Sequence, residues 1–412
     1  MFKKIFNVFS HFKIIFTSLC ALVFLSGGQS STELDILYLS YHSDPSRSIA
    51  ICWHTLVEDR ESKIYLRKAG EAQWLEKEGF FDEAGLYQVL IHKCEIEGLE
   101  PSSEYEFHLP GSERVYTFRT LPLSLDNESV KYVIAGDAYR SYAAFHRVNR
   151  QIVRADPSFV VIGGDIAYTK GSRDSFRDHI WEIKQWHSFF SEWKNVMVGA
   201  SGHMIPIVPV VGNHDVPRKT TDPKDHFVLL YKLFPFHLNT ISYGVLDVGN
   251  YLSLFLLDTG HTYPIAGDQT LWLKQALMQR KNTPFKMAAY HVSAYPSVYD
   301  FKSKTSVKIR DNWSPLFESE GVKLAFEHHN HAYKRTYPIK NLKKDPEGVV
   351  YIGDGCWGVS PRRPYKAWYL EERKKESCFN IISLSKELCD VTVVSSRGSI
   401  IDHVQRQAAA PL

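Results

Sequence analysis

The sequence lacks any long run of lysine or arginine, and its formal net charge at pH 7 is only +3. Proteins that hold nucleic acid through its phosphates need basic side chains clustered on one face. The short basic cluster at residues 340–344 is typical of a solvated loop. We therefore expect no nucleic-acid partner.

Cysteine is also scarce, with six in 412 residues and no Cys-x-x-Cys pair. Cys20 lies in an N-terminal apolar run, and the others are widely spaced. The odd number that remains after Cys20 is removed does not imply a disulfide framework. One bridge is compatible with an exported chain, but the sequence does not select a pair. Buried free thiols are therefore the default expectation.

The N-terminus has the pattern of a secretory signal. Basic residues precede a mostly apolar run at residues 14–25, and small residues follow up to Ser31. The run is too short to span a bilayer comfortably. We expect a signal peptide over residues 1–28 and an exported protein, secreted or periplasmic, with no stable membrane insertion after cleavage. An uncleaved anchor is the alternative. The remaining length predicts two domains.

Residues 32–122 are predicted to form an all-β domain. Short β-rich runs at 48–55, 63–67 and 88–96 are separated by turn-forming residues, and Ile49, Ile51 and Trp53 recur with a period of two. That period indicates a strand with one face in a core, anchored by Trp53. With its Leu-x-Pro turn at 99–101 and its closing strand, the segment resembles a fibronectin type III-like sandwich, which usually serves as a scaffold. Residues 122–130 have the composition of a linker.

Residues 130–406 alternate between apolar strands and helical stretches. Strands at 132–135 and 158–162 flank a helix at 143–154, and this unit predicts parallel strands buried on both faces in an α/β domain. Pro206 and Pro209 disfavour regular pairing of a third strand at 205–211. The apolar face of the helix is expected to hold Phe145, Val148, Ile152 and Val153. The other expected elements are helices at 176–198 and 268–278, two strands within 243–258, strands at 285–290 and 322–326, and three final β-rich runs with a turn at 397–398.

Side chains that can bind metals follow these strands at the points where they end. In open α/β sheets the ligand crevice lies outside the carboxyl ends of the strands, so residues far apart in the sequence are expected to converge there. Glycines precede several of them, which fits sharp turns of the chain. In chain order the residues are Asp137, Asp165, Tyr168, Asn213, His214, Asp215 and His291.

The stretch at 327–338, EHHNHAYKRTYP, follows the strand at 322–326 and has three histidines within four positions. Neutral imidazole is the commonest side-chain metal ligand. His329 and His331 are two residues apart, so in extended backbone they would project the same way and bind one metal centre or two adjacent ones. A solvated histidine-rich loop is the alternative, but the residues at the other strand ends favour a metal site.

These motifs, in this order, resemble the purple acid phosphatase family of dinuclear metallophosphoesterases. The matching motifs are GD, GDxxY, GNHD, a histidine after a strand, and HHNHAYKR, and the segment HVSAYPS resembles the HxPxY segment of the family. The resemblance covers nearly all of the exported chain. It implies an α/β (α+β sandwich) metallophosphoesterase domain at residues 130–406, preceded by the all-β fibronectin type III-like sandwich.

The resemblance also implies two metal ions: a ferric ion and a divalent ion, which would be iron, zinc or manganese. Asp165 would bridge them. The phenolate of Tyr168 would give the ferric site its purple colour. Carboxylate and phenolate oxygens suit a trivalent ion, whereas imidazoles and an amide oxygen suit a softer divalent one. The other implied ligands are Asp137, Tyr168 and His331 for the ferric ion and Asn213, His291 and His329 for the divalent ion.

On the substrate side, the resemblance implies that His214 faces the phosphoester and protonates the leaving alkoxide, with Asp215 orienting it. This chain departs from the family pattern nearby. Arg140 follows an altered DxG motif, His328 stands where the family has glycine, and Tyr295 lies in a segment where many members carry substrate histidines. We expect these three residues to be further substrate contacts, although His328 could instead cap its strand.

The sequence therefore predicts an exported dinuclear metal-dependent phosphoesterase of the acid phosphatase type. It would hydrolyse small-molecule phosphomonoesters with a metal-activated hydroxide. One alternative is a phosphodiesterase that acts on nucleotides or lipid head groups. Another is a non-catalytic metal-containing binding protein, motivated by the altered first motif and the missing substrate histidines. The oligomeric state stays open.

Overall fold

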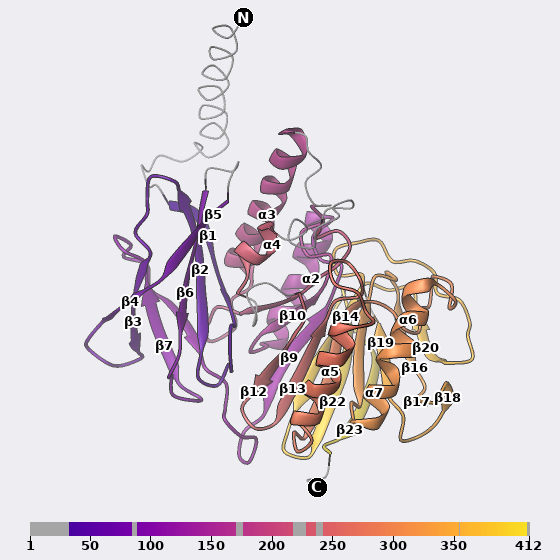
Figure 1. Ribbon diagram of the computed structural model, residues 1–412. Coiled ribbons are helices and arrows are strands. Elements are labelled where there is room, and N and C mark those ends of the chain that lie inside the picture. Colours follow the sequence, from indigo (N-terminus) through magenta and orange to yellow (C-terminus); the bar gives the residue numbers. More distant parts are fainter. Residues whose placement is uncertain are drawn as a thin grey trace, which may run out of the picture.

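The computed structural model describes residues 33–84, 89–169, 176–216, 228–235, 242–353 and 355–409. The predicted signal peptide lies outside these ranges. Two large β-sheets pack face to face with helices on their outer surfaces, and a smaller β-sandwich stands beside them (Figure 1). The predicted order, an all-β domain followed by an α/β domain, is thus present.

The elements closely follow the pattern of the sequence. The helices are α2 Tyr142–Ala155, α3 Phe176–Val196, α4 Val228–Leu233, α5 Asp268–Gln279, α6 Lys304–Asn312 and α7 Ser314–Ser319. The strands are β1 Glu33–Ser40, β2 Ile49–Leu56, β3 Lys63–Lys68, β4 Leu75–Glu78, β5 Phe80–Glu83, β6 Val89–Ile96, β7 Glu104–His108, β8 Tyr116–Arg119, β9 Val130–Ala135, β10 Val160–Gly163, β11 Ile207–Val210, β12 Gly244–Val248, β13 Leu252–Leu257, β14 Phe285–Val292, β15 Leu324–His328, β16 Tyr333–Thr336, β17 Ile339–Lys340, β18 Lys343–Lys344, β19 Val350–Gly353, β20 Leu370–Lys374, β21 Cys378–Leu384, β22 Leu388–Ser395 and β23 Ile400–Gln407.

The larger sheet has the order β23-β22-β21-β9-β10-β11-β1-β2-β6-β5. Its centre is the predicted strand–helix–strand unit, because β9 and β10 pair in parallel and α2 connects them. Helix α2 begins after Ser141, whose hydroxyl accepts from the N–H of Ala144, and it buries Phe145, Val148 and Ile152. Val153, expected on the same face, is only partly buried. Helix α2 and part of α3 cover the outer face of this sheet.

Strand β11 pairs regularly with β10 in spite of its proline, and Pro209 lies opposite Ile162. On its other edge, β11 pairs with β1 at a single position, Ile207 opposite Ser40. A proline has no N–H to donate to a neighbouring strand. The irregular pairing that the prolines predict is therefore confined to the edge of β11 that faces β1.

The second sheet has the order β12-β13-β14-β15-β19-β16-β20, in which β13, β14, β15 and β19 are parallel. Helices α5, α6 and α7 lie on its outer face (Figure 1). The inner faces of the two sheets share one apolar core, to which β10 contributes Val161 and β15 contributes Phe326. The parallel strands of both sheets therefore present their carboxyl ends to a common region.

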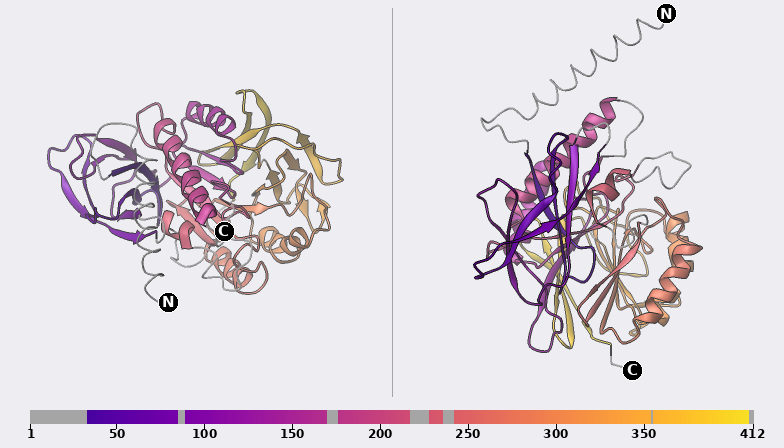
Figure 2. Two further views of the ribbon diagram at one scale, coloured as in Figure 1. Left: turned by 90° about the horizontal axis from the view of Figure 1, so that it is seen from above. Right: turned by 60° about the vertical axis from the view of Figure 1, so that its left-hand side comes forward.

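The N-terminal sandwich is not a separate body. Its second sheet, β4-β3-β7-β8, faces β2 and β6, but β1 joins the ten-stranded sheet through β11. Strand β2 is buried on both faces, which corrects the expectation of one buried face. The cause is α3, whose Phe190 stacks on Tyr38 and contacts His54, and Figure 2 shows this helix beside the sandwich. Trp53 is buried as predicted and stacks on His92.

The segment predicted as a linker is irregular but fixed, because the carbonyl of Leu123 accepts from the N–H of Asn250 in the turn between β12 and β13. Cys52, Cys94, Cys356, Cys378 and Cys389 are buried free thiols, as expected. Among the helices of the described ranges, none combines the length and the apolar character needed to cross a membrane.

Candidate metal centre

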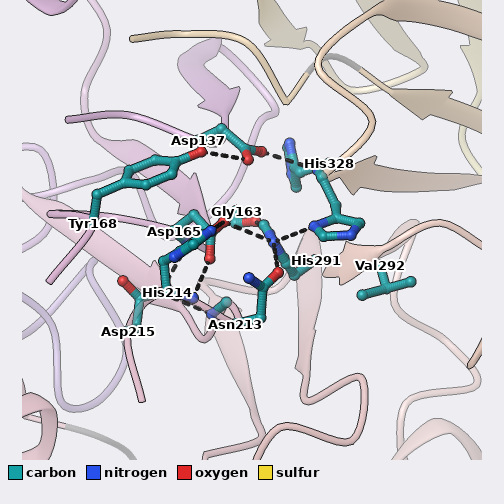
Figure 3. A network of polar contacts seen from close by, with 12 residues as sticks. Asp137, Gly163, Asp165, Tyr168, Asn213, His214, Asp215, His291, Val292 and His328 are labelled. Atoms are coloured by element: carbon teal, nitrogen blue, oxygen red, sulfur yellow. Dashed lines mark hydrogen bonds and ion pairs between the residues drawn. The ribbon is translucent and has the colours of Figure 1, made fainter. Parts of the chain in front are cut away.

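The predicted convergence of the strand ends is present in the structure. Strands β9, β10 and β11 arrive from one sheet and β14 and β15 from the other, and the polar side chains that follow them form one network (Figure 3). Asp165 lies near the middle of this network, with Asp137 and Tyr168 on one side and Asn213 and His291 on the other. Sequence order and sheet topology together explain the cluster, because every contributing loop leaves a parallel strand at its carboxyl end.

Left-handed backbone is concentrated at this site. Positive φ angles occur at Asp137 (58°), Asp165 (54°), Tyr168 (56°), His329 (66°) and His331 (55°). A non-glycine residue in this region costs about 1 kcal/mol or more, and such strain gathers where function requires a particular side-chain direction. All five residues are candidate metal ligands, so backbone strain is concentrated at the predicted metal site.

The glycines in these loops have two different roles. Gly164 has a positive φ of 88°, as a sharp turn requires. Gly212 instead allows close approach, because a Cβ there would stand 2.1 Å from the backbone nitrogen of Asp165. The prediction of sharp turns is therefore correct for Gly164, whereas at Gly212 the reason is the nearness of the two loops.

The first group of side chains consists of Asp137, Tyr168 and His331. The phenol of Tyr168 donates to Oδ1 of Asp137 at 2.8 Å, and Nε2 of His331 lies 2.9 Å from the same oxygen. Burial opposes ionisation of Asp137, but the hydrogen bond from His331 and the neighbouring imidazoles outweigh it and lower the pKa of Asp137. Burial, with Asp137 and Asp165 nearby, raises the pKa of the Tyr168 phenol. A bound cation would favour the phenolate instead.

The second group consists of Asp165, Asn213, His291 and His329. Nε2 of His291 lies 3.2 Å from Oδ1 of Asn213, 3.2 Å from Nδ1 of His329 and 3.4 Å from Oδ2 of Asp165. Burial and the nearby His291 lower the pKa of His329 to about 3, so this imidazole is neutral, as a metal ligand must be.

These residues fit a metal ion. Single ligand atoms from Asp165, His291 and His329 all lie within 4.8 Å of one another. Nδ1 of His291 lies 2.9 Å from the carbonyl oxygen of Gly163 and donates to it, which fixes the tautomer with Nε2 directed at the other ligands. Oδ2 of Asp165 is buried, and apart from the ion-pair contact with Nε2 of His291 at 3.4 Å it accepts no hydrogen bond within the described ranges. A cation would satisfy this oxygen.

Burial alone would lower the pKa of His291, but the adjacent carboxylate of Asp165 raises it to about 10. Metal binding would displace that proton, because a ligating imidazole is neutral.

His329 and His331 do not lie in extended backbone, which corrects the geometry expected from their spacing. Strand β15 ends at His328, and both later histidines have positive φ. Their rings therefore separate: His329 approaches His291, whereas His331 approaches Asp137. The expectation that they serve adjacent centres fits this arrangement better than a shared single centre.

His214 lies next to both ligand groups, whereas the contacts of Asp215 differ from those expected. The ring of His214 stacks on Tyr168 with centroids 4.8 Å apart, and its Nε2 lies 3.9 Å from Oδ2 of Asp165. The carboxylate of Asp215 accepts three backbone N–H groups, from Asp165, Ile166 and Gly212, each at 2.8 Å. Asp215 therefore fixes the β10 and β11 loops to each other.

Two predicted substrate contacts are placed differently by the structure. His328 is buried, and Cβ atoms added at Gly163 and Gly136 would stand 1.8 Å and 2.6 Å from its ring. The ring thus fills space that the two glycines leave. Tyr295 is fully buried in the core outside β14, where its ring packs on Tyr351 and Tyr369. Neither side chain reaches a substrate from these positions.

Arg140, the third predicted contact, is exposed beside the site. Its guanidinium carbon lies 5.8 Å from the ring centroid of Tyr168. This position is compatible with the predicted contact to a phosphate.

His261 is a site residue that the sequence analysis missed. It follows β13 in the loop DTGHTY, and its ring centroid lies 5.7 Å from that of His291. Thr259 holds the ring through a 3.0 Å hydrogen bond to Nε2, and Asp258 accepts the backbone N–H of His261 at 2.7 Å. The available signal was a glycine followed by a histidine at the end of another parallel strand.

Two family models match the chain: calcineurin-like phosphoesterase over residues 130–333 and the N-terminal domain of purple acid phosphatases over residues 35–120. Purple acid phosphatase 15 of Arabidopsis thaliana is 25% identical over 288 residues, which are 65% of this chain and 53% of the relative. Purple acid phosphatase 21 of the same plant is 26% identical over 275 residues, 64% of this chain and 58% of the relative. The chain thus spans little more than half the length of these relatives.

The fold is also found in a solved structure. A purple acid phosphatase isolated from yellow lupin (Lupinus luteus) seeds is similar with a TM-score of 0.75 at 15% sequence identity. The match covers 90% of this chain and 73% of that one. The two proteins therefore share both the sandwich and the two-sheet domain.

Proposed function

Because the chain belongs to the calcineurin-like phosphoesterases and carries the N-terminal domain of purple acid phosphatases, we propose that it is a dinuclear metal-dependent hydrolase of phosphomonoesters. The observation that carries the proposal is the pair of ligand groups around Asp165. Asp137, Tyr168 and His331 supply a carboxylate, a phenol and an imidazole on one side. His291, His329 and Asn213 supply two imidazoles and an amide oxygen on the other.

The donor sets suit two different ions. We assign the group with Tyr168 to a ferric ion and the group with His291 to a divalent ion, iron, zinc or manganese, with Asp165 as the shared ligand. When bound, such a pair of ions lowers the pKa of a water molecule and neutralises charge on the phosphoryl oxygens. The chain positions this chemistry through the strained loops and through the carboxylate of Asp215.

His214 and His261 are assigned to the substrate. His214 lies over Tyr168 and close to Asp165, and this position supports the assignment of its imidazole as the proton donor to the leaving oxygen. His261 lies beside His291 in a chain whose β14 loop lacks the substrate histidines of the family. We therefore assign it the task of hydrogen bonding to the phosphoryl group, together with Arg140 at the Tyr168 end.

The test combines metal content and turnover. Purified protein should hold about two metal ions per chain, and Asp165→Asn should lose metal and lower kcat/KM for para-nitrophenyl phosphate on the order of a thousandfold. Asp311→Asn, an exposed carboxylate on α6 at the outer face of the second sheet, is the matched control. Trace metal in the wild type, with unchanged activity in Asp165→Asn, would contradict the proposal.

Two further measurements refine the assignment. A visible absorption band that disappears in Tyr168→Phe would identify a phenolate bound to ferric iron, whereas a colourless active enzyme would indicate another metal pair. Bis(para-nitrophenyl) phosphate serves as the diester probe, and faster turnover of the diester than of the monoester would reassign the substrate class. Metal-loaded protein that hydrolyses neither ester would point to a binding function.

We also propose that the protein is exported, on the basis of the N-terminal signal pattern in residues 1–28. N-terminal sequencing of protein from the extracytoplasmic fraction would check this. A chain that begins at Met1 and stays in the cytoplasm would contradict it.

A further inference from the structure

An exposed aromatic ring lies on one of the candidate metal ligands. Tyr299, in the loop after β14, stacks on His329 with ring centroids 4.9 Å apart and an interplanar angle of 23°. The residue is 37% exposed, so its ring marks the open edge of the site next to the second ligand group. A side chain in contact with Tyr299 would therefore lie close to a substrate bound at the proposed metal centre.

Tyr299 holds an arginine from a distant part of the chain. The guanidinium of Arg362 donates to the hydroxyl of Tyr299, and its central carbon lies 5.4 Å from the centroid of the same ring. At its other end, the backbone N–H of Arg362 donates to the carbonyl of His331 at 2.6 Å. The backbone of Arg362 is thus fixed beside the candidate ligand His331, and its side chain is fixed, through Tyr299, beside the candidate ligand His329.

Within the described ranges, Arg362 has no acidic partner. Its partners are a hydroxyl, an aromatic ring and a carbonyl, and no carboxylate of the described ranges forms an ion pair with it. Arg280 and Arg335, by contrast, are paired with Asp247 and Asp402. A guanidinium has five N–H donors in a planar fork, and Tyr299 accepts from one nitrogen, so donors remain for a carboxylate or a phosphate.

We propose that Arg362, positioned by Tyr299, binds a second anionic group of the substrate, a carboxylate or a second phosphate, while the reacting phosphate lies at the metal centre. The substrate class is then a phosphomonoester whose alcohol part carries its own negative charge. The inference rests on the proposed function for the location of the reacting phosphate. The side chain of Arg362 is already fixed before an anion binds, so it loses little conformational entropy on binding. Little of the binding free energy is therefore spent on ordering the side chain.

A purely structural role of Arg362 predicts a different effect of its replacement on phosphoester hydrolysis. If Arg362 only ties its loop to the β15 loop, its replacement disturbs His329 and His331 and affects all phosphoesters alike. If it binds a second anion, its replacement affects only esters that carry one. The ratio between two matched substrates separates these cases.

The experiment uses metal-loaded full-length protein and two matched pairs of esters. Glycerate 3-phosphate differs from glycerol 3-phosphate by a carboxylate, and fructose 1,6-bisphosphate differs from fructose 6-phosphate by a second phosphate. The ratio of kcat/KM within each pair should exceed one in the wild type and fall about tenfold in Arg362→Ala at low salt. The pair with the larger change identifies the anion.

Further variants test the geometry. Arg362→Lys keeps the charge without the planar fork, and Tyr299→Phe keeps the ring on His329 without the hydroxyl, so both should lower the ratio by a smaller factor. The neighbouring exposed Arg363 provides the control, and Arg363→Ala should leave both ratios unchanged. Ratios in Arg362→Ala and Arg362→Lys that stay within twofold of the wild type would overturn the inference.

Binding measured without turnover keeps the two proposals apart. Calorimetric titration of the same proteins in their metal-free form with glycerate 3-phosphate and glycerol 3-phosphate gives a ratio of Kd values that should show the same tenfold loss in Arg362→Ala. If neither ester is hydrolysed but this ratio changes, the proposed function fails and the anion site stands. If both esters are hydrolysed and neither ratio changes, the anion site fails and the phosphoesterase stands.

Discussion

The packing of His328 on two glycines leads to a prediction that can be worked out from distances. A methyl group added at Gly163 would stand 1.8 Å from Nε2 and 1.9 Å from Cδ2 of His328. To restore an ordinary contact of 3.4 Å the ring would have to withdraw by about 1.6 Å. Gly136 also lies against this ring, because a Cβ built there would stand 2.6 Å from the ring carbon Cγ. Gly163→Ala should therefore destabilise the protein by about 3 kcal/mol or more.

Removing the ring should rescue this substitution. His328→Ala alone leaves a cavity and should cost about 2–4 kcal/mol. In that background the methyl group at residue 163 occupies free space, so Gly163→Ala should cost less than about 1 kcal/mol. The coupling between the two substitutions should thus be favourable by at least about 2 kcal/mol.

The assay is urea unfolding of metal-free protein, followed by tryptophan fluorescence for the wild type, both single variants and the double variant. Gly212→Ala is the matched control, because its methyl group would meet the backbone nitrogen of Asp165 at 2.1 Å and not the ring of His328. It should be costly, and His328→Ala should not rescue it. Additive costs for the Gly163 and His328 pair, within about 0.5 kcal/mol, would refute the packing described here.

Three other outcomes are expected. Asp215→Asn offers one acceptor oxygen to three backbone N–H groups, so it should destabilise the protein by about 1–3 kcal/mol and weaken metal binding, as measured by thermal unfolding and metal titration. His261→Asn should lower kcat/KM for a phosphomonoester about ten- to a hundredfold while metal content stays unchanged; a loss of metal instead would make it a ligand. Burial and the nearby His92 lower the pKa of His54 to about 3, so below its usual value of 6.5 the unfolded chain binds a proton that the folded chain does not. Stability should therefore fall as the pH drops from 6.5 towards 3, by about 2 kcal/mol at pH 5, and His54→Gln should flatten this dependence in urea unfolding; an unchanged slope would contradict it.

Most strands and helices of the second domain could be predicted because their local patterns agree with their environment. The strand–helix–strand unit around α2 is strongly periodic, and each parallel strand ends in residues with special chemistry. The predictions were wrong where a distant element changes the environment of a residue. Strand β2 alternates as if one face were exposed, yet α3 buries the other face.

The same distinction applies to the candidate site. Asp137, Asp165 and His291 could be found from their places at strand ends. The roles of His328, Tyr295 and Asp215 could not, because these depend on which atoms of another loop or sheet lie within a few ångströms. His261 was missed because a histidine in a turn is unremarkable until β13 is known to be parallel to β14.

By itself, the sequence determined which residue types follow which strands, and hence the chemistry that the loops can offer: two aspartates, a phenol, an amide and three imidazoles. The family resemblance already implied how these residues divide into two groups around Asp165. Only the tertiary structure decided that His328 fills the space left by two glycines, and that Tyr299 contacts Arg362 beside the candidate ligands. The physical reason is that local pattern fixes the direction of a strand, whereas loops that meet across two sheets are fixed by contacts between residues far apart in the chain.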